Sequence, residues 1–392
     1  MGNRQYDVVI LGATGFTGGL VADYFAANVE QVKIRWAIAG RSVDKLEAVK
    51  IRLLHQYPDC KSVGVIVCDT NQLKSVEKMT AQTKMIVTTV GPFALYGANV
   101  VKACVKTGTH YCDITGEPEF VKQMVRDYDA AAREKGIYIT HCCGFDSIPA
   151  DAGAYFTAMQ LPANETKQIK GFVTTNAAFS GGTYASAIHA MSGIGKSVGE
   201  KPESSEKQTA KQALPEWPYY EKTWKKWAVP MPVIDPWIVR RTAKSRPQVF
   251  GSGFSYAQYL ALPDLPKVVK LVASVGAVAI GAQIPPVKEW LLKFKKSGDG
   301  PSEAKRAKSW FKVDFIGESE TKKVQTRVSG GDPGYTETSK MLSETALTIL
   351  EHEGQLPLAG GVVTPAGVLG HLLIEKLEAK GIRFEVLESS FR

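Results

Sequence analysis

The feature that most constrains the fold is a short apolar run that leads directly into a glycine-rich turn. Residues 6–11 (YDVVIL) are apolar and partly β-branched, as in a buried strand, and residues 20–25 have helical spacing. In the spacing GxxGxxG, one glycine permits the tight turn, one lets the backbone approach a pyrophosphate, and one lets helix and strand pack closely; the helix N-terminus attracts phosphate. The pattern predicts a dinucleotide-binding turn, with a plain strand–helix turn as the alternative. The residues expected to bind the nucleotide here are Gly12, Thr14, Gly15, Phe16, Thr17 and Gly18.

The end of the second expected strand, at 33–39, indicates which nucleotide is bound. A site for NAD usually places an acidic residue here to bind the ribose 2′-hydroxyl, but this chain has Arg41, followed by Ser42. A guanidinium pairs bidentately with a phosphate, so Arg41 favours NADP(H) over NAD(H). The alternative interpretation is that Arg41 only caps or solvates the loop.

Strands and helices continue to alternate up to residue 150. Strands are expected at 63–68, 85–90 and 137–141, with helices at 99–107 and 119–135. This alternation predicts an α/β fold, a Rossmann-type doubly wound parallel sheet, in which ligands bind beyond the carboxyl ends of the strands. Asp69 follows the third strand, where it is expected to border the adenine. Gly91, Pro92 and Phe93 follow the fourth strand and join the expected cofactor site.

Five titratable side chains near these strand ends are candidates for the proton transfer that accompanies hydride transfer: Tyr111, Asp113, Glu117, His141 and Asp146. Each has a structural alternative. His141 ends a strand, where a packed, hydrogen-bonded imidazole is the commoner case. Asp113 and Glu117 can fix loops through backbone N–H groups, and Asp146 can cap a helix entered at Pro149. The sequence alone therefore singles out no catalytic residue.

The second half of the chain predicts a different architecture. Alternating apolar residues near 311–315 and 324–328 predict antiparallel strands, with helices at 337–350 and 369–380 and a last strand at 382–387. We expect a nucleotide domain over 1–150, an α+β substrate and dimerisation domain over 151–360, and a segment 361–392 that packs back toward the nucleotide domain. Residues 180–192 look helical, and the polar stretch 196–216 is typical of a surface loop.

Two stretches of the second half have compositions found at lipid surfaces. Residues 217–246 interleave tryptophans with basic residues, which suits either a membrane–water boundary or ordinary packing. Residues 271–287 contain no charge and are flanked by lysines on both sides. A spanning helix needs about 20 apolar residues. This segment is shorter and reaches Pro285 and Pro286 near its end, which suits a segment that lies in a lipid interface. Two alternatives stay open: a helix buried in the fold or at a dimer contact, and a helix that spans the bilayer.

Composition narrows the partners. The chain of 392 residues is 44% hydrophobic and 22% charged, as in globular proteins, and its net charge of +9 suits an anionic ligand or surface. No nucleic-acid-binding motif and no signal peptide are recognisable, so neither a nucleic-acid partner nor secretion is expected. The six cysteines lack metal-type spacing, which predicts free thiols in a reducing compartment and no metal site.

Several motifs together resemble one family. The glycine turn at 12–18, the sequence AGRS at 39–42, VGPF at 90–93, DITGE at 113–117 and GFDSIPAD at 144–151 occur in the order seen in saccharopine dehydrogenase-like oxidoreductases. The resemblance continues through GDPGY at 331–335 and GGVVTP at 360–365. The family includes bacterial trans-acting enoyl reductases, and its animal members are similar to lipid-droplet-associated proteins.

The resemblance implies an NADP(H)-dependent oxidoreductase that acts by hydride transfer on a lipophilic substrate, acyl or glycolipid-related. We expect it to be a homodimer, peripheral on the cytoplasmic side of a membrane or lipid droplet. The alternative is a catalytically silent, nucleotide-binding scaffold on the same surfaces.

Overall fold

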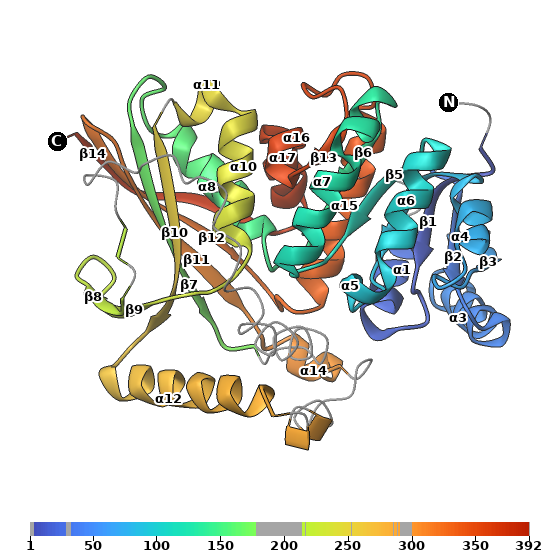
Figure 1. Cartoon of the computed structure of the whole chain (residues 1–392), viewed down its shortest axis with the longest axis horizontal. Helices are drawn as coiled ribbons and strands as arrows, with labels where there is room; N and C mark the ends of the chain where they lie inside the picture. Colours follow the sequence, from blue (N-terminus) through green and yellow to red (C-terminus); the bar gives the residue numbers. More distant parts are fainter. Residues whose placement is uncertain are drawn as a thin grey trace. The chain divides into compact units, whose positions relative to one another are not determined.

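Two compact units make up the chain (Figure 1). The structure, a computed structural model, describes residues 4–28, 33–177, 214–215, 217–251, 253–284, 286–287, 289–290 and 300–391. Unit 1 comprises Met1–Ile148 and Gly331–Ile382, and unit 2 comprises Pro149–Gly330 and Arg383–Arg392.

Unit 1 is built on a seven-stranded sheet in the order β13-β6-β5-β4-β1-β2-β3, and every pairing in it is parallel. Strand β1 lies inside the sheet and is fully buried over Val8–Ile10, since helices cover both faces. The strand order reverses between β1 and β4, which is the position where doubly wound sheets bind dinucleotides. The predicted Rossmann-type sheet is confirmed. Its strands are β1 (Tyr6–Leu11), β2 (Trp36–Gly40), β3 (Gly64–Val67), β4 (Thr83–Thr88), β5 (His110–Asp113), β6 (Tyr138–Thr140) and β13 (Gly361–Val363).

The helices of unit 1 come from both of its chain segments. The first segment supplies α1 (Phe16–Ala27), α3 (Val43–Gln56), α4 (Leu73–Thr80), α5 (Phe93–Tyr96), α6 (Ala98–Thr107) and α7 (Pro118–Glu134). The second segment supplies α15 (Thr336–Glu351), α16 (Pro365–Leu369) and α17 (His371–Ala379).

Helix α15 explains why unit 1 includes residues 331–360, which the sequence analysis assigned to the second domain. It contacts α1, β4 and β5, and it is buried over almost its whole length. Its buried hydroxyls donate to backbone carbonyls four or five residues earlier in the chain; for example, Thr345 donates to the Met341 carbonyl at 2.7 Å. Residues 331–360 were expected in the second domain, but they belong to unit 1. The sequence pattern identified the helix without indicating which sheet it covers.

Unit 2 contains a mixed sheet in the order β14-β12-β11-β7-β10-β9-β8. The predicted antiparallel pair near 311–328 is confirmed, with Phe315 opposite Thr326. Only the pairing of β7 with β10 is parallel among the described strands of this sheet. The strands are β7 (Lys167–Thr175), β8 (Tyr219–Glu221), β9 (Lys226–Pro230), β10 (Phe254–Leu262), β11 (Phe311–Glu318), β12 (Lys322–Gly330) and β14 (Arg383–Phe391), and the helices are α8 (Ile148–Met159), α10 (Asp235–Ser245), α11 (Pro247–Phe250), α12 (Leu265–Ala282) and α14 (Glu303–Arg306).

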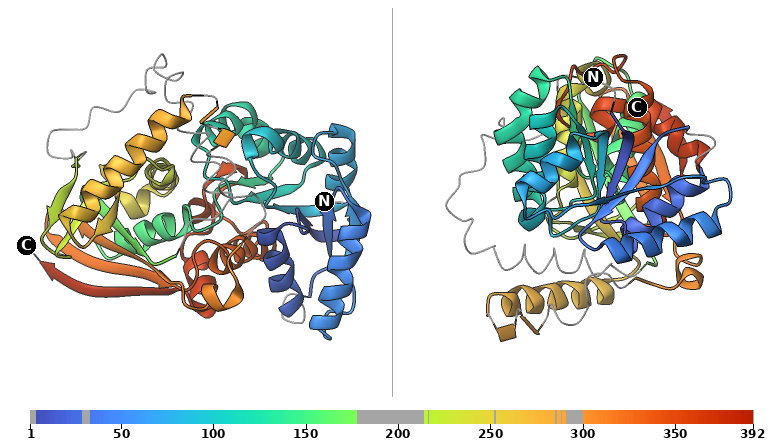
Figure 2. Two further views of the ribbon diagram at one scale, coloured as in Figure 1. Left: turned by 90° about the horizontal axis from the view of Figure 1, so that it is seen from below. Right: turned by 90° about the vertical axis from the view of Figure 1, so that its right-hand side faces the viewer.

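Helix α12 carries the apolar segment that the sequence singled out. It begins after Asp264, whose side chain accepts the Lys267 N–H at 2.9 Å, and Figures 1 and 2 show it as a long helix set apart from the sheet of its unit. Among the described helices, this is the one that is long and apolar enough to cross a membrane, by length and composition alone, and 11% of it is buried. The interpretation of this segment as a buried helix is therefore wrong for the single chain.

The aromatic and basic stretch 217–246 is partly packed. Trp227 contacts Tyr220 edge-on at 5.9 Å, and Arg241 lies 5.0 Å from the ring of Trp237, whereas Trp217 is 81% exposed. The helix expected at 180–192 and most of the loop expected at 196–216 lie outside the described residues.

Candidate functional site

The glycine turn after β1 has the geometry of a nucleotide cradle. Gly12 has φ +96°, a conformation that side chains disfavour, and its carbonyl accepts the Gly15 N–H at 2.9 Å. A Cβ on Gly18 would lie 2.1 Å from the Gly12 oxygen, so helix and turn approach too closely for any side chain. A Cβ on Gly15 would meet only that same oxygen, at 3.3 Å. Gly12 therefore makes the turn, Gly18 permits the packing, and Gly15 leaves its open side to a ligand.

The loop after β4 lies against this turn. A Cβ on Gly12 would come within 2.8 Å of the Val90 side chain. The loop continues through Gly91 and Pro92, joined by a cis peptide bond, to Phe93 at the start of α5. Phe93 is only 5% exposed, and its ring centroid lies 6.1 Å from that of Phe120. Its side chain therefore packs inside the unit and anchors the loop.

Glu117 holds the start of α5 in place. Its two carboxylate oxygens accept the backbone N–H groups of Phe93 and Ala94, each at 2.9 Å. The structural alternative considered for Glu117 is therefore the arrangement that forms, and it ties the loop after β5 to the loop after β4.

Arg41 stands at the carboxyl end of β2 with an exposed side chain. Ser42 provides the cap of α3, because its hydroxyl accepts the Lys45 N–H at 3.4 Å. No hydrogen bond or ion pair engages the Arg41 guanidinium within the described part of the chain. Capping is thus done by Ser42, and Arg41 is available for a phosphate.

Asp69 is occupied by its own loop after β3. Its carboxylate accepts the Asn71 N–H at 3.0 Å and the Gln72 side-chain amide at 3.3 Å. These contacts shape the turn into α4, and the expected contact of Asp69 with adenine stays a prediction.

Three of the proton-transfer candidates form one buried cluster at the ends of β5 and β6. The Tyr111 hydroxyl donates to Asp113 at 2.8 Å, and His141 Nδ1 lies 2.7 Å from the same Asp113 oxygen. The other oxygen of Asp113 accepts the N–H groups of Thr115 and Cys142, at 3.0 and 3.1 Å. Burial, reinforced by the Asp113 charge, raises the pKa of Tyr111 well above its ordinary value.

None of these three side chains is more than 1% exposed. Asp113 therefore fixes the geometry of two loops, and His141 is the packed, hydrogen-bonded histidine that the alternative interpretation described. Cys142 adopts a left-handed backbone conformation with φ +62°, which aims its N–H at Asp113.

Asp146 differs from the other candidates because its side chain is exposed. Its carboxyl group lies against Gly116, where a Cβ would come within 3.2 Å of Oδ2. No hydrogen bond or ion pair of Asp146 occurs among the residues that the structure describes, so it does not cap α8. Desolvation by the surrounding protein raises its pKa to about 6.

Two contacts in the site come from the second segment of unit 1 and were not foreseen. Tyr335 packs edge-on against Phe16 of the glycine turn, with ring centroids 4.8 Å apart. Thr338 Oγ1 accepts the Phe145 N–H at 3.0 Å and anchors the loop that carries Asp146. The sequence motif GDPGY marked this region, but no local pattern reveals contacts between residues 319 and 193 positions apart in the chain.

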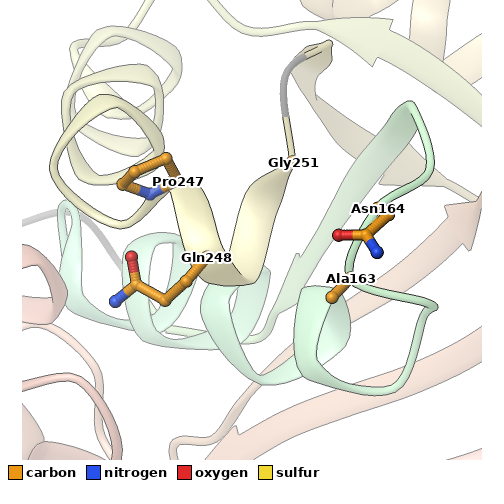
Figure 3. A pocket seen from close by; sticks show the side chains of 5 residues that line it. All are labelled: Ala163, Asn164, Pro247, Gln248 and Gly251. Carbon is orange, nitrogen blue, oxygen red and sulfur yellow. The ribbon is translucent and has the colours of Figure 1, made fainter.

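Unit 2 has a surface pocket next to α11, lined by Ala163, Asn164, Pro247, Gln248 and Gly251 (Figure 3). Its lining contains no ionisable side chain, so it offers no acid–base chemistry. Among the described residues, no cluster of three His, Cys, Asp or Glu side chains could hold a metal ion.

The parallel sheet, the glycine cradle and the free guanidinium define a dinucleotide-binding domain of the oxidoreductase class, joined to a second, mixed-sheet unit. Residues 8–140 match the family model of the saccharopine dehydrogenase NADP-binding domain. The whole chain is 32% identical to a mouse saccharopine dehydrogenase-like oxidoreductase over an alignment of 423 positions, which covers 99% of this chain and 98% of the relative. The chain belongs to the saccharopine dehydrogenase-like oxidoreductase family.

Two further relatives and one solved structure extend this result. A candidate trans-acting enoyl reductase of Mycobacterium tuberculosis is 30% identical, with 97% of both chains covered. A lipid droplet localized protein of Caenorhabditis elegans is 32% identical, with 99% of both chains covered. Saccharopine dehydrogenase from Saccharomyces cerevisiae has the same fold, with a TM-score of 0.56 at 12% identity over 99% of this chain and 100% of that one.

The cofactor of unit 1 is NADP(H), and the cradle fits it. The glycine turn would hold the pyrophosphate at the N-terminus of α1, whose first turn has no acidic residue. Arg41 would pair with the 2′-phosphate. Bound there, the nucleotide supplies hydride chemistry, which no protein side chain provides.

Proposed function

We propose that this protein is an NADP(H)-dependent oxidoreductase that transfers hydride to or from a lipophilic substrate, acyl or glycolipid-related, and that it works at the cytoplasmic side of a lipid surface. The observation that carries the proposal is an apolar helix, α12, exposed on a chain whose other unit binds NADP(H). The name of the mycobacterial relative, an enoyl reductase, supports the proposed reaction, and that of the nematode relative, a lipid droplet localized protein, supports the proposed lipid surface.

The faces of α12 separate into three groups around the helix axis at 100° per residue. Val268 and Ala282 are buried, and Leu271 and Val278 on the same side are half-buried. Lys267, Lys270 and Ser274 form a polar stripe beside them. The remaining arc is apolar and exposed, with Leu265, Val269, Val272, Gly276 and Ile280 as its main members.

This exposed arc is wide enough to enter a lipid interface without unfolding. Val269, Val272 and Ile280 are 60%, 52% and 71% exposed, and a Cβ on Gly276 would meet no atom within 4 Å. Transfer of these three side chains from water into lipid is worth about 1 kcal/mol each, or on the order of 100-fold in partitioning. Lys267 and Lys270 lie on the polar stripe and not on this arc, and Lys267 pairs with Asp264 at 3.1 Å, so the apolar side chains alone account for this partitioning.

The lipid-surface part is tested by replacing Val269, Val272 and Ile280 with Ser. We expect the variant to stop floating with phosphatidylcholine vesicles that contain phosphatidylserine, while its NADPH affinity stays unchanged. Val275 and Val278 are poorer targets, because they lie on the same side as the buried Val268 and Ala282.

A matched control replaces Val43, Ile51 and Val67 with Ser, three side chains of unit 1 that are 50%, 66% and 55% exposed. This control should float like the unchanged protein. Equal flotation of both triple variants, or no flotation of the unchanged protein at any ionic strength, contradicts the lipid-surface proposal. If the α12 variant changes its oligomeric state and not its flotation, the exposed arc of α12 is a dimer contact.

The oxidoreductase part is tested by NADPH oxidation in the presence of fractionated lipid extracts, followed at the absorbance of the reduced cofactor. The Gly15→Ala variant and heat-inactivated protein serve as controls. Tight NADPH binding without turnover in any fraction would favour the silent scaffold. The homodimer stays a prediction, to be measured by light scattering.

A further inference from the structure

Asp146 is the proton-transfer candidate whose carboxylate is left free by the fold. Tyr111, Asp113 and His141 are buried together, and Glu117 is bound to two backbone N–H groups. Asp146 is exposed and unpartnered among the described residues. A carboxylate kept unpaired in the middle of a well-anchored loop has no evident structural task.

The loop that carries Asp146 is held from two sides. Thr338 of α15 accepts the Phe145 N–H at 3.0 Å, and a Cβ on Gly144 would come within 3.0 Å of the Thr338 methyl group and 3.3 Å of Ile114. Gly116 lies directly against the Asp146 carboxyl group. The backbone that carries Asp146 is therefore held in place on both sides.

The site of Asp146 on the sheet indicates which part of the cofactor it meets. Arg41, at the end of β2, places the adenosine half with its 2′-phosphate on the β2 side of the glycine turn. The nicotinamide half of a bound cofactor would then lie on the other side of the switch point, toward β4, β5 and β6. The loops after β5 and β6 carry Gly116 and Asp146.

We propose that Asp146 faces the nicotinamide ring and is the group that exchanges the proton accompanying hydride transfer. This inference rests on the proposed function. In the reducing direction, hydride from NADPH adds to one atom of the substrate's double bond, and the π electron pair moves to the other atom. The Asp146 carboxylic acid donates its proton to that atom, and solvent reprotonates the carboxylate. The oxidising direction reverses each step.

The ionisation of Asp146 suits this role. Solvent reaches the Asp146 side chain, but the protein atoms around it desolvate the carboxyl group, and this desolvation raises its pKa to about 6. Both protonation states are therefore populated near neutral pH. The titratable groups on the neighbouring elements have their own partners: Asp113 has Tyr111 and His141, Glu117 has the start of α5, and Glu337 of α15 pairs with Lys340 at 2.7 Å.

The placement is tested without any substrate. The oxidised nicotinamide ring is cationic and the reduced ring is neutral, so a facing carboxylate strengthens binding of NADP⁺ relative to NADPH once it ionises. We expect the ratio of the two Kd values to change about tenfold in favour of NADP⁺ as pH rises through 6. The ratio should be independent of pH in Asp146→Asn and unchanged from the parent in the control Asp127→Asn, which alters an exposed acid on α7.

Turnover provides the second readout once a lipid fraction supports it. Asp146→Asn should lower kcat about 100-fold or more with the KM for NADPH unchanged, and Asp146→Glu should restore part of it. A pH-independent Kd ratio in the parent protein overturns the inference, whether or not turnover is found. A ratio that depends on Asp146 in a protein without turnover refutes the proposed function and the proton exchange, but leaves the placement of Asp146 beside the ring. Unchanged melting temperatures exclude misfolding as the cause.

Discussion

Three glycines of the nucleotide turn should respond to the same substitution in three different ways. In Gly18→Ala, the new methyl group would lie 2.1 Å from the Gly12 oxygen and 2.8 Å from Thr89 Oγ1, so α1 must move away from the turn. Overpacking of this kind costs about 1–3 kcal/mol. In a unit of about 200 residues that corresponds to a fall in Tm of roughly 2–12 °C. NADPH binding should be lost with it.

Gly15→Ala and Gly19→Ala separate binding from stability. The Gly15 methyl group meets only the Gly12 oxygen at 3.3 Å, so the fold should tolerate it while the pyrophosphate is displaced. The Gly19 methyl group has its nearest neighbour at 3.8 Å, so this helical substitution should raise stability by about 0.5–1 kcal/mol and keep NADPH affinity. Gly12→Val is no test of binding alone, because φ +96° and the contact with Val90 make it disrupt the fold.

Calorimetry and titration of NADPH fluorescence measure both effects on the same samples. A Gly18→Ala protein with parental Tm and Kd would refute the close packing of helix and turn. A Gly15→Ala protein that binds NADPH normally would refute the assignment of that side of the turn to the pyrophosphate.

Two further substitutions test the supports of the site. Glu117→Ala removes two charged hydrogen bonds and should destabilise unit 1 by about 1–3 kcal/mol by calorimetry, whereas Glu119→Ala, an exposed acid two residues away, should cost less than about 0.5 kcal/mol; equal effects would contradict the role of Glu117. Burial alone would raise the pKa of Asp7, but hydrogen bonds from Arg35 and the nearby Lys84 hold it at about 2. Since this lies below the unfolded value of about 3.9, the carboxylate stabilises the fold above pH ~4 and loses that effect as pH falls toward 2. Asp7→Asn should lower the free energy of unfolding by about 1 kcal/mol at pH 7, and the fall of that free energy between pH ~4 and 2 should become shallower in denaturation measurements.

The nucleotide-binding half of the fold could be predicted because its signals are local. The strand, glycine turn and helix at 6–27 are consecutive in sequence, and Arg41 follows directly from the end of the next strand. The alternation of strands and helices then leaves little choice of topology, since parallel crossovers have a fixed hand.

The parts that could not be predicted depend on contacts between distant segments. Residues 331–382 complete unit 1 through α15 and β13, yet a periodic apolar pattern says only that a face is buried, not against what. The same holds within the site. Glu117 and Asp146 look alike as loop carboxylates, and only the fold reveals that one binds backbone N–H groups while the other is free.

The most direct test of the account is the nucleotide preference of Arg41→Ala, measured by titration with NADPH and NADH. Loss of a charged hydrogen bond to the 2′-phosphate should weaken NADPH by about 1–3 kcal/mol, or roughly 5–150-fold. NADH affinity should stay unchanged, and Lys45→Ala, an exposed cation on the first turn of α3, should affect neither nucleotide. Equal weakening of both nucleotides, or a parent protein that binds NADH as tightly as NADPH, would contradict the assignment of this site to NADP(H).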